Sequence, residues 1–256
     1  MNDLFSLQGR VALVTGGSRG IGRMIAAGFL RQGAKVYITA RKAAACDAAA
    51  AELSTLGPCI SLPCDVSGVE ACRALAATLA EREPDGIDIL VNNAGAAWGE
   101  PFETFPEQGW DKVMDLNVKT PFFLSQALYP LLRKAGQKRP AKVINIASID
   151  GISVNPWETY SYSASKAGLI HLTKRMALRL VKDNLIVSGI APGAFASEMN
   201  KEARDHGDEV AHRIPAGRIG TEEDMAGAAI YLASRAGDYV LGETIVVDGG
   251  VTHARG

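Results

Sequence analysis

The chain has 256 residues, of which 47% are hydrophobic and 21% charged, and its formal net charge at pH 7 is −1. This composition is typical of a globular protein with a substantial core, and the charge gives no reason to expect nucleic acid as a partner. No apolar run is long enough to cross a membrane and no secretory signal is visible, so we expect a cytoplasmic protein without a membrane partner. The four cysteines lack the spacing of a zinc site, so we expect reduced thiols and no metal.

Short apolar runs alternate with longer helical patterns along the whole chain. Seven runs predict strands that are buried on both faces: Val11–Val14, Lys35–Thr39, Cys59–Asp65, Ile87–Asn92, Lys142–Ala147, Leu185–Ile190 and Thr244–Val247. Helices are predicted between them, over Gly20–Gln32, Cys46–Leu56, Gly68–Glu81, Trp110–Arg133, Tyr160–Asp183 and Glu222–Ser234. This alternation predicts an α/β protein with a doubly wound parallel sheet (Rossmann fold), in a single domain over residues 1–256.

The segment from Ala194 to Ile214 is polar, with scattered Met, Phe and Gly residues, and follows a predicted strand. Ligands bind at the carboxyl ends of the strands in such sheets, so we expect a mobile lid over about residues 194–214. Thr221, which precedes three acidic residues, is expected to cap the last helix.

A glycine-rich loop follows the first predicted strand and opens the first predicted helix. Glycines allow a tight turn and a close approach of the backbone to a diphosphate at the helix N-terminus. The spacing Gly-x-x-x-Gly-x-Gly differs from the more common Gly-x-Gly-x-x-Gly, and a purely structural tight loop is the alternative. We expect the cofactor to contact the loop residues Gly16, Ser18, Arg19, Gly20, Ile21 and Gly22.

The end of the second predicted strand indicates which dinucleotide binds. An acidic residue usually stands there when the ligand is NAD, but this chain has Ala40 followed by Arg41. A guanidinium suits a 2′-phosphate and Arg19 can approach the same group, so we predict NADP(H) as the cofactor. Solvated surface arginines are the alternative. Asp65, at another strand end, could accept from the adenine amine or serve as a turn residue.

Tyr162 and Lys166 stand four residues apart in a predicted helix and therefore share one of its faces. An ammonium favours the phenolate, so we expect Lys166 to lower the pKa of Tyr162 from its usual value of about 10. Such a tyrosine can exchange protons with a carbonyl or alcohol oxygen. A core aromatic beside a solvated lysine is the alternative, and the motifs that accompany the pair argue against it.

With these motifs in place, the chain resembles the classical short-chain dehydrogenases/reductases over essentially its whole length. Thr15–Gly22 is similar to the family's Thr-Gly-x-x-x-Gly-x-Gly, Asn92–Gly95 to its Asn-Asn-Ala-Gly, and Tyr162 with Lys166 to its Tyr-x-x-x-Lys. The resemblance implies that the catalytic residues are Asn117, Ser148, Tyr162 and Lys166. It also implies further cofactor contacts from Val66, Asn93, Ala94, Gly95, Tyr162, Lys166, Pro192, Gly193, Phe195 and Ser197, besides Arg41, Asp65 and the glycine-rich loop.

The resemblance implies a mechanism and a substrate class. Ser148 would stabilise the oxyanion of a carbonyl substrate, Tyr162 would pass the proton, and Asn117 would hold a water linked to Lys166. Within the family the chain is most similar to NADP-linked β-ketoacyl reductases, including the type associated with rhamnolipid synthesis. A 3-oxoacyl thioester of CoA or acyl-carrier protein is therefore the expected substrate. The alternatives are a dehydrogenase for another alcohol or ketone (sugar, polyol, steroid or xenobiotic) and a non-catalytic NADP-binding sensor.

The substrate pocket and the partners are less directly encoded. Large side chains in loops near strand ends, which are Trp98, Trp157, Tyr160, Phe195 and Met199, are expected to line the pocket or to pack the lid. The run from Arg133 to Lys142 holds five positive charges and no acid; it could meet an acyl-carrier protein or CoA phosphates, or be a solvated loop. The resemblance implies a homodimer or homotetramer, paired through the helices around Trp110–Arg133 and Tyr160–Asp183, with a second interface at the tail Asp248–Gly256.

Overall fold

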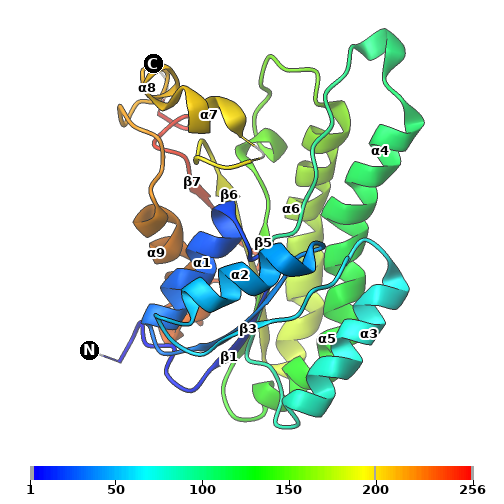
Figure 1. Ribbon diagram of the computed structural model, residues 1–256, viewed down its shortest axis with the longest axis vertical. Helices are drawn as coiled ribbons and strands as arrows, with labels where there is room; N and C mark the ends of the chain where they lie inside the picture. The colour runs from blue at the N-terminus through cyan, green and yellow to red at the C-terminus, as the bar shows by residue number, and fades with distance from the viewer. Residues whose placement is uncertain (1–2, 199, 255–256) are drawn as a thin grey trace.

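Seven parallel strands form one sheet in the computed structural model, which describes residues 3–198 and 200–254 (Figure 1). The strand order is β3-β2-β1-β4-β5-β6-β7. The strands are β1 (Val11–Thr15), β2 (Lys35–Thr39), β3 (Cys59–Ser61), β4 (Ile89–Asn92), β5 (Ala141–Ile146), β6 (Leu185–Pro192) and β7 (Thr244–Val247). The predicted doubly wound parallel sheet is confirmed.

Helices cover both faces of the sheet (Figure 1). One face is covered by α1 (Gly20–Arg31), α2 (Ala43–Leu53) and α9 (Glu222–Ala233), and the other by α3 (Val69–Arg82), α5 (Thr120–Gly136) and α6 (Tyr160–Leu180). Each layer encloses its own apolar cluster against the sheet, with Phe29 in the first and Leu128 in the second. The strands are continuous apolar runs because both of their faces are buried.

The helix predicted over Trp110–Arg133 is interrupted. The structure has α4 (Glu107–Met114), then a π-helical turn, η2 (Asp115–Lys119), and then α5. A π-helical turn perturbs the hydrogen-bond ladder of a helix and occurs frequently at functional sites. Here it carries Asn117, whose side chain is buried. The apolar periodicity of the segment does not distinguish such a turn from a continuous α-helix.

Two other predicted segments differ in extent. The strand predicted over Cys59–Asp65 ends at Ser61, although the amides of Leu62 and Cys64 still donate to carbonyls at the end of β2. The predicted lid contains two short helices, α7 (Lys201–Asp205) and α8 (Gly207–Ala211), which lie beyond the carboxyl edge of the sheet (Figure 1). The cap predicted at Thr221 is confirmed, and the structure shows a capping box there, since the Thr221 hydroxyl and the Asp224 carboxylate each accept from the other's amide.

The basic run from Arg133 to Lys142 lies at the opposite edge of the sheet from Ser148. The length of β5, about 20 Å at 3.3 Å per residue, separates its two ends. Cations of the run are engaged in ion pairs: Arg139 contacts Asp88 at 2.9 Å, and the buried Lys142 contacts Asp238 at 2.6 Å. The run therefore serves the fold and faces away from the candidate site, so the suggested contact with an acyl-carrier protein there is not supported.

The cysteines are free thiols, and burial raises the pKa of Cys59 and of Cys72 to about 11, which makes both poorly reactive. Within residues 3–198 and 200–254, no helix is long and apolar enough to span a bilayer. The same residues contain no cluster of potential metal ligands. The place of the protein in the cell stays a prediction.

Candidate active site

The strand order of the sheet reverses between β1 and β4. In open α/β sheets, ligands bind beyond the carboxyl ends of the strands at this point. The loops after β1, β4, β5 and β6 therefore frame the candidate site. The glycine-rich loop, Asn93, Ser148 and Gly193 follow these four strand ends in that order.

Tyr162 and Lys166 lie one turn apart on α6, with the lysine Nζ 5.5 Å from the centroid of the tyrosine ring. Lys166 is 5% exposed, and its Nζ donates a 2.8 Å hydrogen bond to the carbonyl of Ile146 at the end of β5. This bond fixes the amine between α6 and the sheet. The hydroxyl of Tyr160 instead donates to Glu158 at 2.8 Å, so Tyr162 is the tyrosine that the structure brings to the lysine.

Burial dominates the proton affinities of this pair. It lowers the pKa of Lys166 to about 8, against the opposing effect of the nearby Asp150 charge. Burial also raises the pKa of Tyr162 to about 12, and Asp150 adds to the shift while a hydrogen bond with Ser148 opposes it. The expectation of a lowered pKa for Tyr162 is therefore wrong, because the cost of desolvating a phenolate, together with the charge of Asp150, outweighs the opposing hydrogen bond with Ser148.

Ser148 lies two residues after the end of β5 and is buried. Its Oγ accepts a 3.1 Å hydrogen bond from the amide of Asp150 and so begins the 3₁₀ turn η3 (Ile149–Gly151). This turn packs closely on α6, since a Cβ added at Gly151 would lie 2.6 Å from the backbone carbonyl carbon of Lys166. The packing holds the Ser148 hydroxyl beside that of Tyr162, with which it hydrogen-bonds.

Asn117 links the loop after β4 to α6. Its Oδ1 accepts from the amide of Ala96 and its Nδ2 donates to the carbonyl of Ala96, both at 2.9 Å. Nδ2 also donates to the hydroxyl of Ser165 at 3.0 Å, next to Lys166 in the chain. Both ends of the side chain thus hold the site together, and the sequence-based expectation is that Asn117 also holds a water linked to Lys166. That role stays a prediction.

A second set of hydrogen bonds joins the loops after β1 and β4. The hydroxyl of Thr15 accepts from the amides of Asn93 and Ala94, each at 2.9 Å. Asn93 Nδ2 donates in return to the carbonyls of Thr15 and Gly16, at 2.8 and 3.3 Å. The side chain of Asn93 therefore positions the glycine-rich loop, and Thr15 is a functional residue that was not predicted from the sequence. Its signal was a hydroxyl at the strand end that opens the motif.

The glycine-rich loop leaves room for an anion at the N-terminus of α1. Gly16 and Gly20 adopt φ angles of 64° and 53°, which favour glycine. A Cβ at Gly22 would lie 2.4 Å from the carbonyl oxygen of Gly16, so the turn requires glycine there. α1 begins without a side-chain cap and without an acid in its first turn, which leaves its first amides available. With Ser18 and Ile21 only partly exposed beside them, these residues fit the diphosphate of a dinucleotide.

Arg19 and Arg41 are exposed at one corner of this loop. The amide of Gly17 donates a 3.1 Å hydrogen bond to the carbonyl of Thr39, which attaches the loop to the end of β2 and brings the two arginines to the same side. Two guanidinium groups at one corner suit the 2′-phosphate of NADP.

The neighbouring strand end contributes Asp65 and Val66. The Oδ1 of Asp65 accepts from the amide of Ser67 at 3.1 Å, which is the role of a turn residue, and its contact with adenine stays a prediction. The Val66 side chain is buried, and its carbonyl accepts from the hydroxyl of Thr120 at 2.8 Å. A cofactor could therefore contact Val66 only through its backbone.

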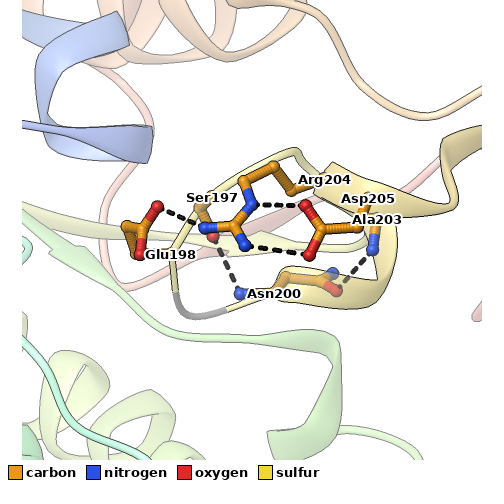
Figure 2. A network of polar contacts seen from close by, with 6 residues as sticks. All are labelled: Ser197, Glu198, Asn200, Ala203, Arg204 and Asp205. Atoms are coloured by element: carbon orange, nitrogen blue, oxygen red, sulfur yellow. Dashed lines mark hydrogen bonds and ion pairs between the residues drawn. The ribbon is translucent and has the colours of Figure 1, made fainter.

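The segment after β6 folds against the glycine-rich loop, since a Cβ at Gly20 would lie 3.1 Å from the Cβ of Ser197. Figure 2 shows how the segment is tied together: the Ser197 hydroxyl accepts from the amide of Asn200 at 3.0 Å. Arg204 pairs with two acidic residues of the same segment, Glu198 and Asp205 (Figure 2). These contacts place the predicted lid beside the diphosphate position, while its mobility stays a prediction.

The side chain of Phe195 does not face the substrate. It is 2% exposed and belongs to the cluster formed with α1 and α9, where a Cβ at Gly220 would lie 2.3 Å from its ring. The expectation that Phe195 lines the pocket is therefore wrong, and only its backbone and that of Pro192 and Gly193 border the site. Met199, also expected in the pocket, lies outside the described residues.

The two tryptophans expected in the pocket have different surroundings. Trp98 packs on α4, where a Cβ at Gly109 would lie 2.7 Å from its indole ring. Trp157 is 57% exposed and lines an open cavity of about 400 Å³. The remaining lining residues of that cavity are Gly99, Glu100, Pro101, Pro156, Glu158 and Thr159. Tyr160 stands beside it, with its ring in edge contact with Phe102 and Phe105.

Two loops and the first residues of the helices that follow them, residues 96–108 and 148–161, form what we call the acidic mouth. The amide of Glu100 donates to the carbonyl of Glu158 at 3.3 Å, and the amide of Phe102 donates to its side chain at 3.1 Å. The two loops contain no Lys or Arg and five acids, which are Glu100, Glu103, Glu107, Asp150 and Glu158. The two loops therefore carry a net negative charge, and Lys112 of α4 lies over the ring of Trp98 beside them.

A buried polar chain beneath the site was also not predicted from the sequence. Asn92 Nδ2 donates to Asn145 Oδ1 at 2.8 Å, and Asn145 Nδ2 donates to the hydroxyl of Thr173 at 2.9 Å. These bonds connect β4, β5 and α6 and so couple the strand ends to the helix of Tyr162. The available signal was the pair of asparagines inside otherwise apolar strands.

Similarity to known proteins covers nearly the whole chain. Residues 16–252 match a family described as enoyl-(acyl carrier protein) reductase. A rhamnolipids biosynthesis 3-oxoacyl-[acyl-carrier-protein] reductase from Pseudomonas aeruginosa is 47% identical over 254 residues, which cover 98% of this chain and 99% of that protein. A gluconate 5-dehydrogenase from Gluconobacter oxydans is 39% identical over 254 residues, covering 98% and 97%.

Similarity to a solved structure also covers nearly the whole chain. The solved RhlG/NADP active-site complex from Pseudomonas aeruginosa matches with a TM-score of 0.94 at 46% identity, covering 98% of this chain and all of that one. Because sequence and fold agree from the glycine-rich loop to the last strand, the chain belongs to the short-chain dehydrogenase/reductase family.

Proposed function

We propose that the protein uses NADPH to reduce a ketone to a secondary alcohol, and that the ketone is a 3-oxoacyl thioester. The observation that carries the proposal is the position of Tyr162, a phenol that is protonated at neutral pH and lies one turn from Lys166 on α6. Its hydroxyl is held beside that of Ser148, so one carbonyl oxygen can accept hydrogen bonds from both. This arrangement supports a proton donor for an oxygen that gains negative charge.

Each residue of the site has a distinct part in this reaction. NADPH, when bound, supplies the hydride to the carbonyl carbon. Ser148 donates a hydrogen bond to the carbonyl oxygen and stabilises the charge that develops on it. Tyr162 transfers its proton to the same oxygen, and Lys166, held by Ile146, offers a positive charge beside the phenolate that remains. Asn117 keeps the loop after β4 against α6 throughout.

The cofactor assignment rests on the corner of Arg19 and Arg41. The glycine-rich loop accommodates a diphosphate, and the end of β2 offers a guanidinium where a carboxylate would select NAD. The solved relative from Pseudomonas aeruginosa is a complex with NADP, which supports the same choice.

The relatives suggest two substrate classes, and the acidic mouth favours one of them. Gluconate and its keto derivatives carry a carboxylate, which the five acids of the two loops would repel. The carbonyl of a 3-oxoacyl thioester is flanked by uncharged groups, and the exposed rings of Phe102 and Trp157 offer apolar contacts to an acyl chain. The 47% identity to a 3-oxoacyl reductase points the same way.

A comparison of two ketones tests this assignment. We expect kcat/KM with NADPH to be at least about 100-fold higher for acetoacetyl-N-acetylcysteamine, an uncharged 3-oxoacyl thioester, than for 5-keto-D-gluconate, because like-charge juxtaposition costs several kcal/mol. NADPH oxidation recorded at 340 nm measures both. A preference for the keto acid would refute the thioester assignment, and tight NADPH binding without turnover of any carbonyl would favour the non-catalytic sensor.

We also propose that the protein is a homotetramer. Large apolar side chains are exposed on and after α5 and α6 (Phe122, Leu178 and Val181) and before β7 (Tyr239 and Leu241). Exposed apolar side chains of this kind suit subunit interfaces in an oligomer with closed symmetry. Light scattering should give four times the chain mass of 27.0 kDa, and a monomer mass would contradict the proposal.

A further inference from the structure

Asp150 is a charged group of the site that the reaction described above does not use. It lies in η3, two residues after Ser148, and is partly buried. Its backbone is fixed at both sides, by the 3.1 Å bond from its amide to the Ser148 hydroxyl and by the packing of Gly151 on α6. The carboxylate therefore projects from a turn held between the catalytic serine and the helix of Tyr162 and Lys166.

The surroundings of the carboxylate are specific. The side chain of Asn155 and the charge of Lys166 act on it electrostatically, and both partly offset the cost of its burial. Its charge in turn acts on both Lys166 and Tyr162. The groups of neighbouring elements that border the pair are uncharged: the carbonyl of Ile146, Gly95 and Asn117. Among the described residues, Asp150 is the one ionised group that acts on both members of the pair.

We propose that Asp150, held by η3 between Ser148 and α6, is a positioning residue for hydride transfer: its carboxylate keeps Lys166 in the ammonium form while Tyr162 donates its proton to the substrate. The proposal rests on the proposed reductase function, since it assigns Asp150 to the proton-donating direction. The reaction consumes one hydride from NADPH and one proton from Tyr162, which solvent then restores.

The signs of the electrostatic effects agree with this role. A negative charge raises the pKa of Lys166 against the lowering effect of burial, and it raises the pKa of Tyr162 in addition to burial. Removal of the charge should lower both pKa values. Tyr162 would then lose its proton at lower pH. The rate of alcohol oxidation would therefore rise at lower pH, and the rate of carbonyl reduction would begin to fall at lower pH than in the parent.

A titration of Lys166 tests the proposal without any substrate. Full-length protein labelled with ¹³C at lysine Cε is titrated by NMR, and the Lys166 signal is assigned by its loss in Lys166→Met. The parent signal should titrate near pH 8. In Asp150→Asn the midpoint should move to lower pH, whereas Asp150→Glu should restore it. An Asp150→Asn midpoint equal to that of the parent overturns the proposal.

The matched control is Glu100→Gln, which removes one negative charge from an exposed position of the acidic mouth. Solvent and salt screen that charge, so the Lys166 midpoint should stay in place. An equal shift of the Lys166 midpoint in both variants would mean that the summed negative charge of the acidic mouth, rather than Asp150 itself, sets this midpoint. That result would also overturn the proposal.

A kinetic measurement then connects Asp150 to proton transfer. For the NADP⁺-dependent oxidation of 3-hydroxybutyryl-CoA, the pH profile of kcat/KM should move to lower pH in Asp150→Asn. On the rising limb of the profile, the rate at a given pH should gain about tenfold if the midpoint moves by about one pH unit. A profile that stays in place contradicts the proposal. If the parent does not oxidise this alcohol at all, the thioester assignment fails, while the NMR titration still decides on Asp150.

Discussion

Replacement of Tyr162 by phenylalanine is expected to lower kcat for carbonyl reduction by about 10²- to 10⁴-fold, the usual contribution of a positioned general acid. The hydroxyl beside Ser148 is the proton donor, and the ring alone retains only the packing against Lys166. The Kd for NADPH, measured by its fluorescence, should change little, because the glycine-rich loop and the two arginines remain intact.

The matched control for this variant is Tyr160→Phe, two residues away on the same helix. It removes a hydroxyl that donates to Glu158, outside the pair formed by Tyr162 and Lys166. We expect it to alter KM more than kcat. Near-normal turnover by Tyr162→Phe, or a loss of kcat in Tyr160→Phe as large as in Tyr162→Phe, would contradict the assignment of the proton donor.

Removal of the Arg41 side chain is expected to lower kcat/KM for NADPH by about 10- to 100-fold and to leave kcat/KM for NADH nearly unchanged. The magnitude follows from the loss of charge-assisted hydrogen bonds to the 2′-phosphate, worth about 1.5–3 kcal/mol. Steady-state kinetics with both cofactors, in the parent and in Arg41→Ala, measure it.

Arg23→Ala is the control for that experiment, because Arg23 is an exposed arginine of α1 that pairs with Glu52 at 2.7 Å. It should leave the ratio of the two kcat/KM values as in the parent. A parent that prefers NADH would refute the role assigned to Arg41, as would an equal loss with both cofactors in Arg41→Ala.

The sheet could be predicted from the sequence because strands buried on both faces leave continuous apolar runs, such as the one at β2. The cap of α9 could be predicted because its signal lies within four residues, from Thr221 to Asp224. The π-helical turn at Asn117 could not, because it leaves the apolar periodicity of α4 and α5 unbroken. Local signals were thus sufficient wherever structure depends on adjacent residues.

The residues that form the candidate site could be predicted from the sequence, but their burial and their pKa values could not. Tyr162, Lys166 and Ser148 are brought together as their motifs indicated. The pKa of Tyr162 moves in the opposite direction from the prediction, because burial depends on the whole fold rather than on the spacing of two residues. The prediction that the Phe195 side chain lines the pocket was wrong for the same reason, because its contact with Gly220 joins segments that are distant in sequence.

Deuterium transfer from 4-deuterated NADPH measures most directly whether this site reduces a ketone. With acetoacetyl-CoA as the acceptor, one deuterium should appear at C3 of the 3-hydroxybutyryl-CoA product for each NADPH oxidised. The transfer should fall in Tyr162→Phe to the same extent as kcat. NADPH that binds tightly but passes no deuterium to acetoacetyl-CoA or to any other carbonyl would contradict the proposed reaction.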